Sequence, residues 1–119
     1  MSQPEIFRTP LSKETIRRLA DEAFVDMVKF VVDLKRKIIC AGGGLHSDEE
    51  QMLLEDGSAQ TDVWGANYYL DNPPEDRWEY ASMINVRPAD GNSKQIITSH
   101  ELRAEVRKLG EHFFEGKPL

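Results

Sequence analysis

The spacing of apolar positions changes several times along the chain, and each spacing predicts one kind of element. A helical spacing covers residues 13–23, where Ser12 can accept a hydrogen bond from a first-turn N–H as the N-cap. Leu11 can pack against Ile16 across this cap as a hydrophobic staple. Residues 1–10 show no such period, so we expect an irregular lead-in there.

Alternation with a period of two replaces the helical spacing after residue 24 and predicts two paired strands. The first strand spans residues 25–34, and one of its faces is formed by Val28, Phe30, Val32 and Leu34. Its other face mixes apolar and charged side chains, which predicts partial cover. Three basic residues at 35–37 make a turn, and the apolar run at 38–41 returns as an antiparallel partner.

A second helix is expected over residues 48–56, after three glycines at 42–44. Ser47 and Glu50 have the spacing of a capping box with Ser47 as the N-cap, and Gly57 suits the position after the last turn. A glycine run before a helix can hold a phosphate. Three acidic residues follow this run and would repel an anion, so a simple backbone turn is favoured.

The second half of the chain predicts more strands and a last helix. Alternation favours strands over residues 63–70 and 78–86, with a short fifth strand over 95–98. Ser99 can cap a helix whose apolar stripe consists of Leu102, Val106, Leu109 and Phe113. The predicted fold is α+β: a single-layer antiparallel sheet of four or five strands with three helices, in the order α-ββ-α-ββ(β)-α. Residues 1–119 are expected to form a single domain.

Charge is unevenly distributed and narrows the possible partners. The 119 residues carry a net charge of −6, and residues 46–90 hold eleven acidic against two basic side chains. Such a surface repels a phosphate backbone, so we expect no nucleic-acid partner. No apolar run is long enough to cross a bilayer, so we expect no membrane partner either. The single cysteine, Cys40, fits a reducing cytoplasm, and we expect a cytoplasmic protein.

His46 is the most suggestive candidate for catalysis. It precedes an acidic helix start, where Asp48 or Glu49 could orient its imidazole as a general base. The simpler interpretation is a hydrogen-bonded residue at the start of a helix. The spacing of the three histidines matches no metal-ligand pattern, and we expect no metal and no cofactor. Divalent-metal binding through Asp48, Glu49 and nearby carboxylates is a weaker alternative.

The second face of the predicted sheet offers a candidate ligand site. Alternation places Asn67, Asn85 and Arg87 on this face, together with Lys29 and Asp33. Amide and guanidinium groups together suit a carboxylate or another polar ligand. An ordinary solvent-facing sheet surface is the simpler interpretation. A dimer face is a third, since apolar side chains lie there too.

Several segments resemble a known family: Gly43-Gly44-Leu45-His46-Ser47-Asp48, Leu53-Leu54-Glu55-Asp56-Gly57-Ser58, Asp62-Val63-Trp64-Gly65-Ala66-Asn67, Ile84-Asn85-Val86-Arg87-Pro88 and Gly91-Asn92. Together they resemble a family of small prokaryotic proteins that is a domain of unknown function, over residues 14–112. The resemblance implies a prokaryotic cytoplasmic protein and carries no activity, ligand or catalytic residue.

Two functions of different classes therefore remain. The first is a non-enzymatic binding or interaction module that forms a homo-oligomer and takes a protein partner or a small polar ligand. The absence of an evident nucleophile or metal-ligand pattern favours it. The alternative is a small enzyme, hydrolase or isomerase-like, that uses His46 with Asp48 or Glu49 and the polar face of Asn67, Asn85 and Arg87.

Overall fold

The computed structural model describes residues 2–119, which form one antiparallel sheet and three α-helices. The strand order is β1-β3-β2-β4-β5. The elements are β1 (Glu5–Phe7), α1 (Lys13–Asp21), β2 (Val28–Asp33), β3 (Ile38–Ala41), α2 (His46–Glu55), β4 (Val63–Tyr68), β5 (Trp78–Glu79) and α3 (His100–Glu115). The predicted α+β fold, with three helices and a single antiparallel sheet of five strands, is confirmed.

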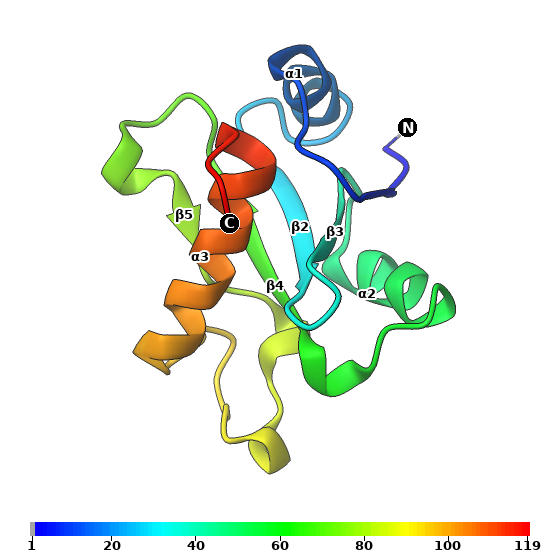
Figure 1. Ribbon diagram of the computed structural model, residues 1–119, viewed down its shortest axis with the longest axis vertical. Coiled ribbons are helices and arrows are strands. Elements are labelled where there is room, and N and C mark those ends of the chain that lie inside the picture. Colours follow the sequence, from blue (N-terminus) through cyan, green and yellow to red (C-terminus); the bar gives the residue numbers. More distant parts are fainter. Residues whose placement is uncertain (1) are drawn as a thin grey trace.

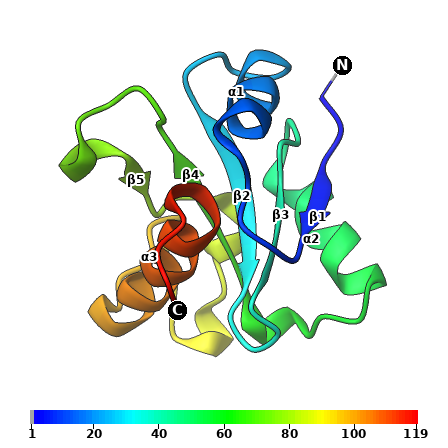
Figure 2. The same cartoon turned by 45° about the horizontal axis from the view of Figure 1, so that its top comes forward.

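The sheet separates two apolar cores of unequal size. Helices α1 and α3 pack on one face and α2 packs on the other (Figures 1 and 2). On the α1–α3 face, Phe30 of the central strand is fully buried and meets Phe114 and Trp78 edge to face. The smaller core under α2 contains Val31, Ile38, Cys40, Leu53 and Val63. The alternation along β2 therefore predicted one apolar face and one partly covered face, and α2 covers the latter.

The lead-in of residues 1–10 contains a strand that its hydrophobic pattern does not predict. Residues 1–10 are expected to be irregular, but β1 pairs with β3 and forms one edge of the sheet, with Glu5 opposite Ala41. Ile6 and Phe7 then pack against opposite cores. Three residues are too few to display a period, so only pairing identifies this strand. The helix start after it is confirmed, because the Ser12 side chain accepts from the Thr15 N–H.

The start of α2 differs from the predicted capping box. The helix begins at His46 rather than at residue 48, and its N-cap is Leu45, without a side-chain cap. Ser47 therefore lies inside the first turn. The imidazole of His46 binds the carbonyl of Ala66 on β4, at 2.8 Å. This tertiary hydrogen bond joins the first helical residue to the sheet, which local capping rules do not anticipate.

The predicted strand over residues 78–86 is wrong beyond Glu79. Strand β5 ends there, and residues 83–85 form a 3-10 turn instead. A Cβ on Gly65 of β4 would lie 2.8 Å from Ser82, so the glycine lets this segment fold over the sheet. The predicted strand over 95–98 is also wrong, since Ile96 forms only an isolated bridge with Ala81. The fifth strand of the sheet is β1.

Helix α3 agrees with its prediction and closes the larger core. Ser99 caps it, its Oγ accepting from the Leu102 N–H at 3.2 Å. Gly110 lies against the Trp78 ring, where a Cβ would be only 2.5 Å from ring carbon Cζ3. This close approach lets Phe114 stack on Tyr68 of β4, with ring centroids 4.6 Å apart. The C-terminal turn of α3 is thereby fixed over the end of β4.

Candidate functional site

Asn85 completes the open edge of β4 with its side chain. Its Oδ1 accepts from the Gly65 N–H at 2.9 Å, and its Nδ2 donates to the Gly65 carbonyl at 2.9 Å and to the Gln95 carbonyl at 3.2 Å. The carboxamide thus supplies the hydrogen bonds that a continued β5 would supply. The residue is fully buried. All three hydrogen bonds therefore serve the fold, and no polar group of this amide faces outward.

Arg87 binds the same edge of β4 one step further along. Its guanidinium donates to the Val63 carbonyl at 2.6 Å and to the Gln60 carbonyl. The charged group also lies over the Trp64 ring, 3.7 Å from the centroid. Only 9% of the side chain is exposed. The cation therefore joins the segment after β5 to the sheet.

Asn67 belongs to a polar row across the other end of the second sheet face. It pairs with Lys29 of β2 on one side and Glu79 of β5 on the other. Its Nδ2 donates to the Glu79 carboxylate at 2.8 Å, and the Tyr69 hydroxyl donates to the same oxygen at 3.0 Å. The Oδ1 of Asn67 is buried and has no partner among residues 2–119.

His46 lies next to this row as a neutral imidazole. Burial, together with the nearby Lys29 ammonium, lowers the pKa of His46 to about 4. Because a carbonyl only accepts, Nε2 carries the proton toward Ala66 and Nδ1 keeps its lone pair. No hydrogen bond in the described chain joins His46 to Asp48, whose side chain is exposed. Glu49 points elsewhere and accepts from the Gly43 N–H at 2.9 Å.

The five candidates predicted from sequence therefore do not share one pocket. His46 and Asn67 are neighbours, and His46 lines a hollow of about 270 Å³ with Lys29, Leu45, Ser47, Ser82, Met83, Ile84 and Gln95, here called the α2 hollow. Arg87 binds β4 three residues away from the carbonyl that His46 binds, roughly 10 Å along a strand. Asn85 binds Gly65, which lies on β4 between Val63, bound by Arg87, and Ala66, bound by His46. The predicted cluster thus divides into one polar pair (His46 and Asn67), two structural side chains (Asn85 and Arg87) and the exposed Asp48.

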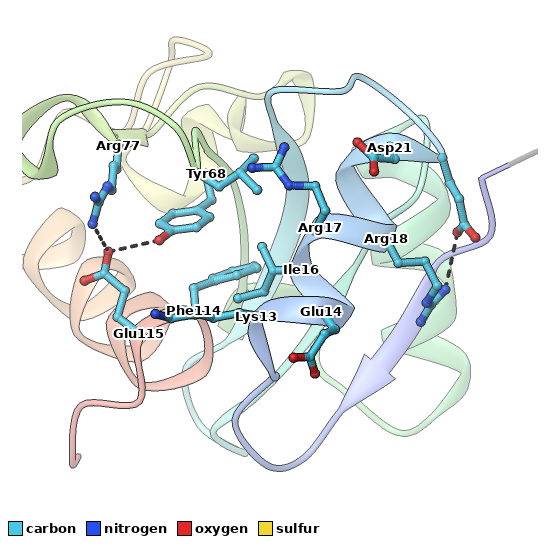
Figure 3. A pocket seen from close by; sticks show the side chains of 12 residues that line it. Lys13, Glu14, Ile16, Arg17, Arg18, Asp21, Tyr68, Arg77, Phe114 and Glu115 are labelled. Atoms are coloured by element: carbon cyan, nitrogen blue, oxygen red, sulfur yellow. Dashed lines mark hydrogen bonds and ion pairs between the residues drawn. The ribbon is translucent and has the colours of Figure 1, made fainter.

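A much larger cleft lies on the opposite face of the sheet, between α1 and α3. Its volume is about 1030 Å³, at the upper end of the roughly 300–1,000 Å³ typical of ligand pockets. Its floor is apolar and consists of Ile16, Leu70 and the stacked rings of Tyr68 and Phe114. Figure 3 shows the Tyr68 ring at the back of this space, between residues of α1 and α3. We call it the α1–α3 cleft.

Charged side chains line the edges of the cleft. Arg17 of α1 pairs with Asp71 at 2.6 Å, and Arg77, just before β5, pairs with Glu115 of α3 at 3.2 Å. Lys13 points from α1 across the cleft toward α3 (Figure 3). No carboxylate of residues 2–119 lies within 4.0 Å of its ammonium. The lining therefore contains one cation that the fold itself does not pair.

The Tyr68 hydroxyl is fixed at the base of the cleft. It donates to Oε2 of Glu115 at 3.0 Å, the same oxygen that Arg77 contacts. Burial and the negative charge of Glu115 raise the pKa of Tyr68 to about 12. The phenol therefore stays protonated near neutral pH, and it serves as a fixed polar group rather than as a base.

No local pattern in the sequence points to this cleft. Its lining comes from four separate segments, and within α1 alone the charged residues resemble any solvated helix face. The amphipathic period of α1 predicted that Ile16 faces the core. Nothing local predicts that α1 and α3 stay far enough apart to leave Ile16 and Phe114 as the floor of a cleft.

Two further features are absent from residues 2–119, a metal-binding cluster and a membrane-spanning helix. No three histidine, cysteine, aspartate or glutamate side chains of residues 2–119 gather closely enough to hold a metal ion. None of the helices in this part of the chain combines the length and apolar character needed to span a bilayer.

Comparison with protein families gives a clear assignment. Residues 5–113 match a family described as a protein of unknown function, DUF5674. The chain belongs to the DUF5674 family. The expected membership of a family of unknown function is thereby confirmed. Searches of curated proteins and of solved structures gave no match. The DUF5674 family brings no activity with it, so the function is argued from the two sites described above.

Proposed function

We propose that this DUF5674 protein is a non-enzymatic binding module that takes a small molecule in the α1–α3 cleft. The observation that carries the proposal is a cleft of about 1030 Å³ with an apolar floor and charged edges. Apolar walls supply affinity, and a few fixed polar groups supply orientation, which is the usual composition of a ligand site. The side chains along the cleft are mainly ion-paired or hydrogen-bonded, and no activated nucleophile stands among them.

A ligand screen with two matched variants tests this proposal. Compounds that bind the native state raise the unfolding midpoint. We expect Leu70→Trp, which adds an indole to the cleft floor, to abolish the shifts. Leu45→Trp makes the same change at an exposed position beside the α2 hollow and should leave them intact. Shifts that survive Leu70→Trp and vanish in Leu45→Trp would reject the cleft as the binding site.

A second candidate function is the small enzyme that uses His46. The observation in its favour is the unprotonated Nδ1 of the imidazole, beside the polar row of Lys29, Asn67 and Glu79. Asp48 makes no hydrogen bond to this imidazole, and Asn85 and Arg87 are engaged by the backbone of β4. Loss of ligand shifts in Leu45→Trp together with His46→Gln would favour this candidate over the cleft.

We also propose a cytoplasmic homo-oligomer. A buried free thiol at Cys40 supports the reducing compartment. Self-association is supported by exposed apolar side chains around the α2 hollow: Leu45 is 58% exposed and Met83 is 70% exposed. Light scattering should report more than one chain per particle, and Met83→Lys should lower this mass. A strict monomer at high concentration would reject self-association.

A further inference from the structure

We infer that the ligand of the α1–α3 cleft is a small organic anion with a flat apolar body. This inference deepens the proposed function and rests on it. It assigns the apolar body to the floor of the cleft and the anionic group to the position beside the Lys13 side chain, which reaches from α1 toward α3 (Figure 3).

The floor of the cleft is shaped for a flat body. Tyr68 and Phe114 stack with an angle of only 18° between their rings, and both are 5% exposed. Ile16 and Leu70 extend this surface on the side of α1. A planar ligand can cover the exposed part of Leu70 above these buried side chains and so remove that apolar area, and the facing side of its own body, from water.

The charge at one end of the cleft favours an anion, although the whole chain carries −6. Lys13 has no carboxylate partner within 4.0 Å among residues 2–119. The Arg17–Asp71 pair is about half exposed on both sides, and such pairs contribute little to stability. Arg17 can therefore exchange part of this contact for a ligand carboxylate. Arg77 stays on Glu115 and adds positive potential near the Tyr68 hydroxyl.

The carboxylates of α1 limit the size of the anion. Glu14, next to Lys13, and Asp21, one turn after Arg17, line the cleft at opposite ends of α1 (Figure 3), and neither forms an ion pair in the described chain. A long polyanion that extended along α1 would meet these carboxylates. One anionic group at the Lys13 end fits the charge pattern, with the uncharged body toward Ile16 and Phe114.

Three probes with one body and different charges test the inference: naphthoate, naphthylmethanol and naphthylmethylamine. Calorimetric titration of the full chain should give the order naphthoate tightest, then the neutral alcohol, then the cation. Added salt should weaken naphthoate binding and leave the alcohol nearly unchanged. Loss of the signals in Leu70→Trp would assign binding to the cleft.

Variants of two lysines separate charge from packing. Lys13→Gln should weaken naphthoate by about fivefold to tenfold, the size of a partly exposed charge-assisted hydrogen bond. It should leave the alcohol unchanged. Lys108→Gln, at an exposed position of α3 outside the cleft, is the matched control and should change neither ligand.

The outcomes distinguish the inference from the proposed function. An amine that binds the cleft as tightly as naphthoate, or equal effects of Lys13→Gln on acid and alcohol, would overturn the anion inference while leaving a ligand-binding cleft. Absence of binding by all three probes at millimolar concentration would overturn both.

Discussion

Replacing Asn85 by alanine is the sharpest test of how the second sheet face is built. The sequence makes Asn85 a ligand-binding candidate, whereas its observed contacts make it part of the sheet. Alanine removes the carboxamide and leaves the Gly65 N–H and the Gly65 carbonyl without their partner, whereas the Gln95 carbonyl keeps the Ser82 N–H at 3.1 Å. The two Gly65 groups make buried hydrogen bonds with Asn85, whose side chain is fully buried.

The magnitude follows from the two Gly65 groups that lose their partner. A buried polar group without a partner costs about 1–3 kcal/mol, so Asn85→Ala should lose about 2–6 kcal/mol in free energy of unfolding. Domains of this size are stable by only about 5–15 kcal/mol, so the loss is a large share of the total. Asn85→Asp keeps the acceptor for Gly65 N–H but sets a carboxylate against two carbonyls. Its stability should therefore fall further as pH rises, since burial raises the pKa of such a carboxyl.

Urea unfolding followed by tryptophan fluorescence measures these losses. Asn72→Ala is the matched control, because its amide makes one exposed hydrogen bond to the Asp76 carbonyl and should cost under about 1 kcal/mol. If Asn85→Ala cost less than this control while ligand binding disappeared, Asn85 would be a binding residue and its structural role would be refuted.

Three further predictions concern pH and packing. His46 is protonated below about pH 6.5 in the unfolded chain but only below about pH 4 in the folded one. The free energy of unfolding should therefore fall from pH 7 to pH 5, by at most about 1.4 kcal/mol per pH unit. Urea titrations of His46→Gln should lack this component. Burial raises the pKa of Glu49 well above its usual range, so the folded carboxyl binds its proton more tightly than the unfolded one, and stability is lost as pH rises above 4.5. The stability of Glu49→Gln relative to the wild type should therefore increase with pH in thermal melts. A stability difference that does not change with pH would contradict this. Gly110→Ala should destabilise by about 1–3 kcal/mol in urea unfolding, despite the better helix propensity of alanine, because its Cβ meets the Trp78 ring.

The elements that the sequence predicted well are those whose hydrophobic period is long and whose caps are local. Helix α3 has four turns and a serine cap, and β2 alternates over six residues, so each element can be predicted from its own residues. Strand β1 has three residues and depends entirely on pairing with β3. The segment after Glu79 alternates like a strand, but Ser82 packs over Gly65 and Asn85 replaces the strand hydrogen bonds. Tertiary contacts decided these two cases.

The candidate site was predictable only in part, because polar residue types have several uses. Asparagine and arginine on one sheet face are compatible with a ligand, and they are equally able to satisfy an open strand edge. Asn85 and Arg87 do the latter, which only the positions of Gly65 and Val63 reveal. His46 and Asn67 do lie together, a pairing that the enzyme hypothesis includes but that no local pattern requires.

The two faces of the sheet therefore differ in how many of their polar side chains are needed to stabilise the fold. On the α2 face, Asn85, Arg87 and Glu49 each bind a backbone group, so that a change there alters stability first. On the α1–α3 face, the apolar core is closed by Phe30 and Trp78, and the charged edges of the cleft contribute little to it. Side chains that stability does not require can vary with the ligand. The free charge of Lys13 above a buried aromatic floor is thus the feature that a binding function explains and folding does not.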